Sequence, residues 1–299
     1  MKKTGIWALI VLVSVLTGFR QDGLDKIFTD GATVEKLAEG FLFTEGPTAD
    51  REGNVYFTDQ PNDRIMVWSV SDKLNTFLQP SGRSNGLAFD NNGLLWACAD
   101  EKNEIWSVDR SKNITKYPLK YSEKIMNGPN DLWIDSKGGI YFTDPFYKRP
   151  WWSHTGQPQE IQGVYYISPD KKEIKRIAVD LKQPNGIVGS EDNKYLFVAD
   201  IGDSKTYRYE IAGEGILTNK MLFCGMGSDG MTIDSEGNIY LTGNGVSVFN
   251  KSGEKIGNIP VPEPWTANVC FGGKDLKNLY ITASKSLYRI RVNIRGTKG

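Results

Sequence analysis

The chain has 299 residues, and its 36 lysines and arginines balance 36 aspartates and glutamates. A neutral chain lacks the basic face with which proteins neutralise nucleic-acid phosphates, so we expect no nucleic-acid partner. The single histidine, His154, excludes sites built from several histidines, so the chemistry must rest on carboxylates, amides, hydroxyls or an oxygen-preferring cation.

An export signal is predicted at the start of the chain, over residues 1–20. Lys2 and Lys3 precede an apolar run over residues 6–16, which has the length of a signal-peptide core and is too short to span a bilayer. Phe19 stands where a bacterial lipoprotein would carry its lipidated cysteine, so a lipid anchor is unsupported. We expect an exported, periplasmic protein with no stable transmembrane span after processing. The alternative is that the run is an ordinary buried segment.

Six strand patterns of one kind follow the predicted signal. Each is a run of β-branched and aromatic residues introduced by a turn, as expected for the second strand of a hairpin. The runs are Gly53–Asp59, Leu94–Asp100, Gly138–Asp144, Tyr195–Asp200, Gly237–Gly243 and Asn278–Ala283. Their last positions are 41, 44, 56, 43 and 40 residues apart. A repeat of about 40 residues made of short strands predicts an all-β, six-bladed β-propeller, here as a single domain over residues 30–295.

The longest interval between runs contains an insertion over residues 146–160. Loops of this length in a compact domain are usually functional or disordered. The insertion carries Trp151, Trp152 and His154, which are candidates to contact a ligand, and we predict that it forms a lid whose tryptophans stack on a bound ring and exclude water. The alternative is that these aromatic residues pack on the propeller rim as a minor core.

One polar residue precedes the end of each run by 14 or 15 positions. These residues, called the ring residues below, are Glu45, Asn85, Asn130, Asn185, Asp229 and Asn268. Equivalent positions of successive blades surround the axis of a propeller, so we expect six oxygen-bearing side chains at one mouth of its channel. The alternative is that they recur only as turn formers, although Glu45 is a poor turn residue.

The charges of the ring residues favour a bound cation. Glu45 and Asp229 are like charges, and holding them close together would strongly raise a pKa unless a cation neutralised them. The four asparagines add neutral carbonyl oxygens. A site of hard oxygens without histidine or cysteine suits one divalent cation, Ca²⁺ first, with Mg²⁺ or Mn²⁺ as alternatives.

The sequence around the ring residues resembles the SMP-30/gluconolactonase/LRE-like family. The resemblance is carried by Glu45-Gly-Pro, Asn130-Asp-Leu, Pro184-Asn-Gly-Ile, Ser228-Asp-Gly-Met and Asn268-Val-Cys-Phe-Gly-Gly. It extends from residue 30 to the last strand. The resemblance implies a six-bladed propeller with a divalent cation, often calcium, at the channel mouth. It also implies that four ring residues bind the metal, namely Glu45, Asn130, Asn185 and Asp229.

The predicted function is metal-dependent hydrolysis of a lactone, in first place a sugar lactone of the gluconolactone type. The cation would polarise the lactone carbonyl, and the resemblance gives Asp229 the role of general base. Asn85 and Asn268 are candidates to bind substrate hydroxyls or a metal-bound water. Arg83 is a candidate to bind a substrate oxygen, and the alternative is that it is a solvated surface arginine. Two alternatives stay open: a related metal-dependent esterase or phosphotriesterase, and a non-enzymatic propeller that binds a ligand.

Overall fold

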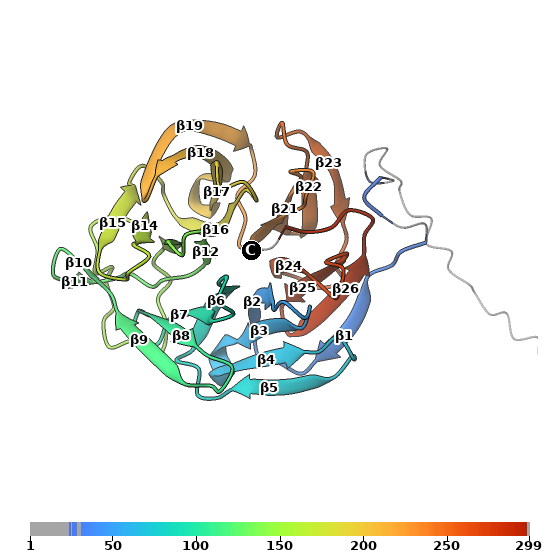
Figure 1. The fold of residues 1–299 in the computed structure, drawn as a ribbon, viewed down its shortest axis with the longest axis horizontal. Coiled ribbons are helices and arrows are strands. Elements are labelled where there is room, and N and C mark those ends of the chain that lie inside the picture. The colour runs from blue at the N-terminus through green and yellow to red at the C-terminus, as the bar shows by residue number, and fades with distance from the viewer. Residues whose placement is uncertain (1–23, 25, 29–30, 298–299) are drawn as a thin grey trace, which may run out of the picture.

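The computed structural model describes residues 24, 26–28 and 31–297, so the predicted export signal lies outside the described residues. Six four-stranded antiparallel sheets surround a central axis (Figure 1). This arrangement confirms the predicted six-bladed β-propeller. Over the described part of the chain, no helix is long and apolar enough to cross a membrane.

Five blades run from an innermost to an outermost strand in chain order, and blade 6 takes its outermost strand from the start of the described chain. Blade 1 contains β2 (Thr44–Ala49), β3 (Val55–Asp59), β4 (Arg64–Trp68) and β5 (Leu74–Leu78). Blade 2 contains β6 (Ser84–Phe89), β7 (Leu95–Ala99), β8 (Glu104–Val108) and β9 (Ile114–Pro118). Blade 3 contains β12 (Leu132–Ile134), β13 (Ile140–Asp144), β14 (Gly163–Ile167) and β15 (Ile174–Ala178).

The remaining blades follow the same plan. Blade 4 contains β16 (Pro184–Gly189), β17 (Tyr195–Asp200), β18 (Lys205–Gly213) and β19 (Ile216–Cys224). Blade 5 contains β20 (Met231–Ile233), β21 (Ile239–Gly243), β22 (Gly245–Phe249) and β23 (Lys255–Ile259). Blade 6 contains β24 (Thr266–Gly272), β25 (Asn278–Ala283), β26 (Ser286–Arg291) and, outermost, β1 (Glu35–Glu39). Outside the blades, the hairpin β10 (Lys120–Tyr121) and β11 (Lys124–Ile125) and two short 3₁₀ turns, η1 (Gln60–Asn62) and η2 (Ile201–Asp203), complete the described elements.

The two ends of the described chain meet in blade 6. β1 pairs antiparallel with β26, so the first strand of the described chain completes the last sheet. This pairing closes the circle of blades (Figure 1) and covers the edge that β26 would otherwise present to solvent.

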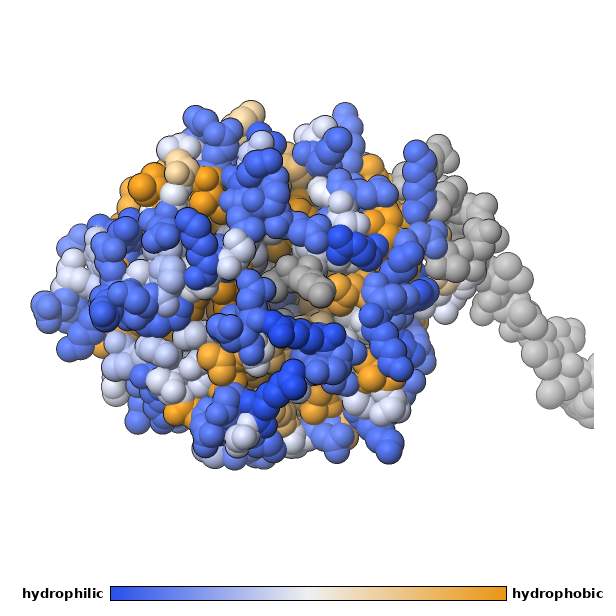
Figure 2. All heavy atoms as spheres, viewed as in Figure 1, coloured by the Kyte–Doolittle hydropathy of each residue, from blue (hydrophilic) through white to orange (hydrophobic). Residues whose placement is uncertain are grey.

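The hydrophobic core lies between neighbouring blades. The second strands of the blades are almost wholly buried, as in the continuous burial of β7 and β13, because both faces of each sheet pack against another sheet. Hydrophilic residues predominate on the face seen in Figure 2. The three cysteines, Cys98, Cys224 and Cys270, are buried and free.

Candidate functional site

The ring residues lie at or just before the starts of the innermost strands, at one mouth of the channel. The pairing register shifts at these points in four blades, between Glu45 and Thr48, Ser84 and Leu87, Pro184 and Ile187, and Thr266 and Asn268. A β-bulge re-aims the side chain at the extra residue. The Asn-Gly pairs of blades 2 and 4 therefore lie in bulged strands, and the alternative that they only form turns does not describe them.

The glycine after a ring residue allows adjacent blades to approach at the axis. A Cβ added to Gly86 would lie 2.6 Å from the carbonyl oxygen of Asn130 in the next blade. The same addition at Gly186 would lie 2.9 Å from the carbonyl oxygen of Asp229. These glycines are needed because a neighbouring backbone occupies the space of a side chain.

Threonines of the repeated runs connect one blade to the ring residue of the next. Thr58 Oγ1 donates to the carbonyl oxygen of Asn85 over 3.1 Å. Thr143 Oγ1 donates to the carbonyl oxygen of Asn185 over 2.7 Å. Both hydroxyls are buried, so these bonds fix the ring residues against the neighbouring sheet rather than against solvent.

Asp229 is the most constrained carboxylate of the ring. Asn185 Nδ2 donates to its Oδ1 over 2.7 Å, and Trp265 Nε1 donates to its Oδ2 over 2.7 Å. Asn185 Nδ2 also lies 2.9 Å from the hydroxyl of Tyr147, which accepts its second hydrogen. The position of the Asp229 carboxylate is therefore set by groups from blade 4 and from the loop before β24.

Glu45 and Asp229 influence each other's ionisation. Burial raises the pKa of Glu45 well above its ordinary value, and the charge of Asp229 raises it further. Burial also raises the pKa of Asp229 to about 6, although hydrogen bonds from Trp265 and Asn185 oppose this rise. Two buried carboxylates that repel each other form a site that a cation would stabilise.

A third carboxylate, Asp131, lies beside the ring and was missed by the sequence analysis. Its Oδ1 accepts a 2.9 Å hydrogen bond from the Leu132 backbone N–H, and Asn268 Nδ2 lies 3.5 Å from its Oδ2. Burial raises its pKa to about 7. One signal for it was present in the sequence: Asp131 follows its ring residue where blades 1, 2, 4 and 5 have glycine.

The donor groups at the ring fit a hard divalent cation. The side-chain oxygens Oδ1 of Asn85 and Asn185 are buried and have no hydrogen-bond partner among the described residues. Such orphaned oxygens are costly unless a ligand meets them. Among the residues described, no three His, Cys, Asp or Glu side chains form a metal-binding group by themselves. A cation here would therefore need the amide oxygens as well as Glu45 and Asp229.

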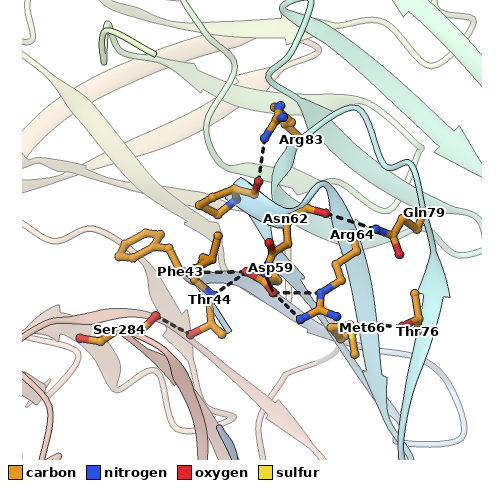
Figure 3. A network of polar contacts seen from close by, with 12 residues as sticks. Phe43, Thr44, Asp59, Asn62, Arg64, Met66, Thr76, Gln79, Arg83 and Ser284 are labelled. Atoms are coloured by element: carbon orange, nitrogen blue, oxygen red, sulfur yellow. Dashed lines mark hydrogen bonds and ion pairs between the residues drawn. The ribbon is translucent and has the colours of Figure 1, made fainter. Parts of the chain in front are cut away.

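Most aspartates that end the repeated runs bind the loop that enters their own blade. Asp59 Oδ1 accepts a 3.0 Å hydrogen bond from the Leu42 backbone N–H, and its Oδ2 accepts one of 2.8 Å from Arg64 (Figure 3). Asp144 likewise accepts two backbone hydrogen bonds, from residues 127 and 128. This local role explains why aspartate recurs at the end of the runs.

Asp100 departs from this pattern and anchors the inserted segment instead. Its Oδ2 accepts hydrogen bonds from Arg149 Nε over 2.8 Å and from Gln60 Nε2 over 2.9 Å. Its carbonyl oxygen accepts a 2.7 Å hydrogen bond from Trp152 Nε1. Burial raises the pKa of Asp100 to about 6, against the opposing effect of Arg149. The insertion is therefore bound to blade 2, across a blade boundary from its own strands.

The aromatic residues of the insertion contact this anchor, two arginines or the ring. Trp152 stacks on His154 with ring centroids 4.8 Å apart. Trp151 lies between two guanidinium groups, with Arg83 4.7 Å and Arg149 5.7 Å from its ring centroid. Tyr147, which the sequence analysis did not single out, is the residue of the insertion whose hydroxyl meets the ring residue Asn185.

A cavity of about 560 Å³ occupies the opposite part of the channel. Its walls include Thr48, Asp90 and Arg295, which lie toward the far ends of the innermost strands. Asn268 is the ring residue that reaches it, together with Asp131. The cavity therefore lies beneath the ring, on the side away from the insertion.

Several known proteins are similar to this chain in sequence and in fold. The family model described as SMP-30/Gluconolactonase/LRE-like region matches residues 43–285. A gluconolactonase of Zymomonas mobilis is 28% identical over 91% of this chain and 85% of its own length. The lactonase drp35 of Staphylococcus aureus strain MRSA252 is 36% identical over 76% of this chain and 72% of its own length. The structure of XC5397, a gluconolactonase from Xanthomonas campestris, superposes with a TM-score of 0.84 at 25% identity, over 90% of this chain and 92% of that one.

Proposed function

Because the chain belongs to the SMP-30/gluconolactonase/LRE-like family, we propose that it is a hydrolase that opens a lactone, in first place a sugar lactone. The observation that carries the proposal is Asp229, a carboxylate whose two oxygens are each held by a hydrogen bond at a mouth surrounded by amide groups. The gluconolactonase and lactonase relatives support the same reaction class.

The proposed cofactor is one divalent cation, Ca²⁺ before Mg²⁺ or Mn²⁺. Glu45, Asn130, Asn185 and Asp229 would hold it, and the orphaned oxygen of Asn185 supports this donor set. Once bound, such a cation supplies Lewis-acid polarisation of the lactone carbonyl. Its charge would also remove the repulsion between Glu45 and Asp229 and lower the pKa of both carboxyls.

Asp229 is the proposed general base that takes a proton from the attacking water. A base must lie within hydrogen-bond reach of the proton that it removes, and its carboxylate must be held in position. Trp265 and Asn185 each hold one oxygen of Asp229 at 2.7 Å. Each carboxylate oxygen has two lone pairs, so beside these two hydrogen bonds and one bond to the cation a lone pair stays available to a water molecule.

Two further ring residues are proposed to bind substrate hydroxyls. The side-chain oxygen Oδ1 of Asn85 is buried without a partner, and it can accept a hydrogen bond from a hydroxyl. Asn268 has one oxygen bound by the Val269 backbone N–H over 2.8 Å and a nitrogen directed at Asp131. The side chain of Asn268 therefore already has partners within the protein, so we propose that it contributes less to substrate binding than Asn85 does.

The experiment that tests this function is a hydrolysis assay on purified protein that lacks only the predicted export signal, residues 1–20. D-Glucono-1,5-lactone, a simple aliphatic lactone, an aryl ester and a phosphotriester would be compared after chelation and after return of Ca²⁺, Mg²⁺ or Mn²⁺. Calcium-stimulated opening of the sugar lactone, abolished in Asp229→Asn, is the expected result. Faster hydrolysis of the aryl ester or the phosphotriester would favour the alternative hydrolase, and absence of all hydrolysis would favour a binding propeller.

The proposed location is the periplasm, after export and removal of the leader. Lys2, Lys3 and the apolar run over residues 6–16 support this proposal. Fractionation of cells that express the whole chain would test it. Recovery of a shortened chain in the periplasmic fraction is expected, and retention of the whole chain in the cytoplasm would contradict it.

A further inference from the structure

Arg83 holds an unusual position immediately before β6, two residues from the ring residue Asn85. Its φ of 51° lies in the left-handed region, which is uncommon for a residue with a side chain. The Asp63 carboxylate accepts a 2.7 Å hydrogen bond from the Arg83 backbone N–H and so helps to hold this conformation. Residues kept in sparsely populated backbone regions often lie at ligand sites.

The guanidinium of Arg83 lacks a carboxylate partner among the described residues. Its Nη1 donates to the carbonyl oxygen of Pro61 over 2.8 Å (Figure 3), whereas its Nε is buried without an acceptor. Arg64 and Arg149, which are also partly buried, do have such a partner, in Asp59 and Asp100 respectively, each at 2.8 Å. Partial burial of a cation without an anion costs free energy that a ligand can return.

Contacts through the insertion place this guanidinium on the lid side of the ring. Arg83 lies over Trp151, Trp151 is near Arg149, and Arg149 lies 5.5 Å from the Tyr147 ring centroid. Tyr147 in turn meets Asn185, the neighbour of Asp229. An unbroken series of contacts therefore runs from Arg83 to the proposed base.

The charges across the mouth are distributed unevenly. Glu45, Asp131 and Asp229 lie at the centre, whereas Arg83 and Arg149 lie toward the insertion. An anionic substituent of a ligand would be repelled by the central carboxylates and attracted to Arg83, since the charge of Arg149 is already paired with Asp100. A ligand with its reacting carbonyl at the ring would therefore direct an anionic substituent toward Arg83.

We propose that the substrate is a lactone with an anionic substituent, a carboxylate or a phosphate, which Arg83 binds beside Trp151. This inference rests on the proposed lactone hydrolysis and specifies its substrate class. The planar guanidinium has donors that match carboxylate and phosphate oxygens, and its buried Nε–H supplies one of them. Trp151 holds the guanidinium by a cation–π contact and leaves its edge for the ligand.

The test compares two pairs of lactones, and the members of each pair differ in one substituent, which is anionic in one member and neutral in the other. D-Glucaro-1,4-lactone and D-glucono-1,4-lactone share a ring and differ by a carboxylate or a hydroxymethyl group at C6. 6-Phospho-D-glucono-1,5-lactone and D-glucono-1,5-lactone form the phosphate pair. At low ionic strength we expect kcat/KM to be at least about 10-fold higher for the charged member of one pair, the size of one charge-assisted hydrogen bond. The pair that shows the preference identifies the anion.

Variants of Arg83 locate the effect. Arg83→Gln should reduce the preference to about twofold, mainly by raising KM of the charged lactone, and Arg83→Lys should retain part of it. Arg208→Gln is the matched control, because Arg208 also lies over an aromatic ring, 4.6 Å from the Tyr195 centroid, but in blade 4 on β18. This control should keep the full preference, and unfolding temperatures would show that each variant is folded.

The outcomes separate this inference from the proposed function. Equal or better hydrolysis of the neutral lactones by the unaltered protein would overturn the anionic substrate class and leave lactone hydrolysis standing. Absence of hydrolysis of every lactone would overturn the proposed function. In that event, calorimetric titration of Asp229→Asn with D-glucarate, 6-phospho-D-gluconate and D-gluconate still decides the inference. Binding of the first two no tighter than of D-gluconate would overturn it.

Discussion

Asn185 donates a hydrogen bond to Asp229 over 2.7 Å, and this bond joins blade 4 to blade 5 at the mouth of the channel. It connects a proposed metal ligand to the proposed base. Any change in the amide of Asn185 therefore alters the orientation of the carboxylate as well as the donor set. The two roles of Asp229 must be separated by experiment.

Asp229→Asn keeps the volume and one oxygen of the side chain but removes the charge and the proton acceptor. Activity should fall about 10²–10⁴-fold, as for the loss of a general base, and calcium affinity should fall with it. The measurement is kcat at saturating calcium, because calcium restores a weakened ligand but not a missing base. Full recovery of kcat at saturating calcium would show that Asp229 does not take part in proton transfer. The matched control is Asp192→Asn, in the exposed turn before β17.

Asp100→Asn should change how stability depends on pH. The pKa of Asp100 is raised from 3.8 to about 6 in the folded protein, so between these values the folded state binds more protons than the unfolded state. Stability should therefore fall as pH rises from about 4 to about 6, by on the order of 3 kcal/mol from this group. Urea unfolding at several pH values should show a flatter profile for the variant. Identical pH profiles of stability for the variant and the unaltered protein would contradict a raised pKa of Asp100 in the folded state.

Trp151 and Trp152 should affect substrate binding by different routes. Trp152→Phe removes the hydrogen bond to the Asp100 carbonyl oxygen and should loosen the insertion, whereas Trp151→Ala removes the surface on which Arg83 lies. Replacing both with alanine should raise KM and leave calcium affinity unchanged, since neither indole belongs to the proposed donor set. Normal turnover by the double variant would show that both tryptophans only pack against the protein and do not contribute to substrate binding.

Gly86→Ala should destabilise the propeller at its axis. The added Cβ would lie 2.6 Å from the Asn130 carbonyl oxygen, and overpacking of this kind costs about 1–3 kcal/mol. Gly225→Ala is the control, because an added Cβ there has no neighbour within 4 Å and its φ is ordinary. Chemical unfolding should separate the two variants. Equal stability would show that the blades can move apart at this point.

Repetition explains what could be predicted from the sequence. The spacing of the runs identified the blades, and a fixed offset from each run identified six residues that share one mouth. The same logic could not find groups that occur once. Tyr147 reaches the ring from the insertion, which has no counterpart in other blades, and Trp265 reaches it from the loop that enters blade 6, at a position where the other blades have no tryptophan. Asp100 follows the repeated pattern in sequence but binds Arg149, 49 positions later, and such a contact depends on the folded loop.

The pairing of β1 with β26 has a consequence for how the chain is made. Glu35 on the first strand binds Arg289, 254 positions later, over 2.9 Å. Until the last segment is available β1 has no partner, so five blades can form while the sixth stays incomplete. A chain that ends before β26 therefore forms an open arc with two bare edges, which is a target for chaperones or proteases rather than a shortened enzyme.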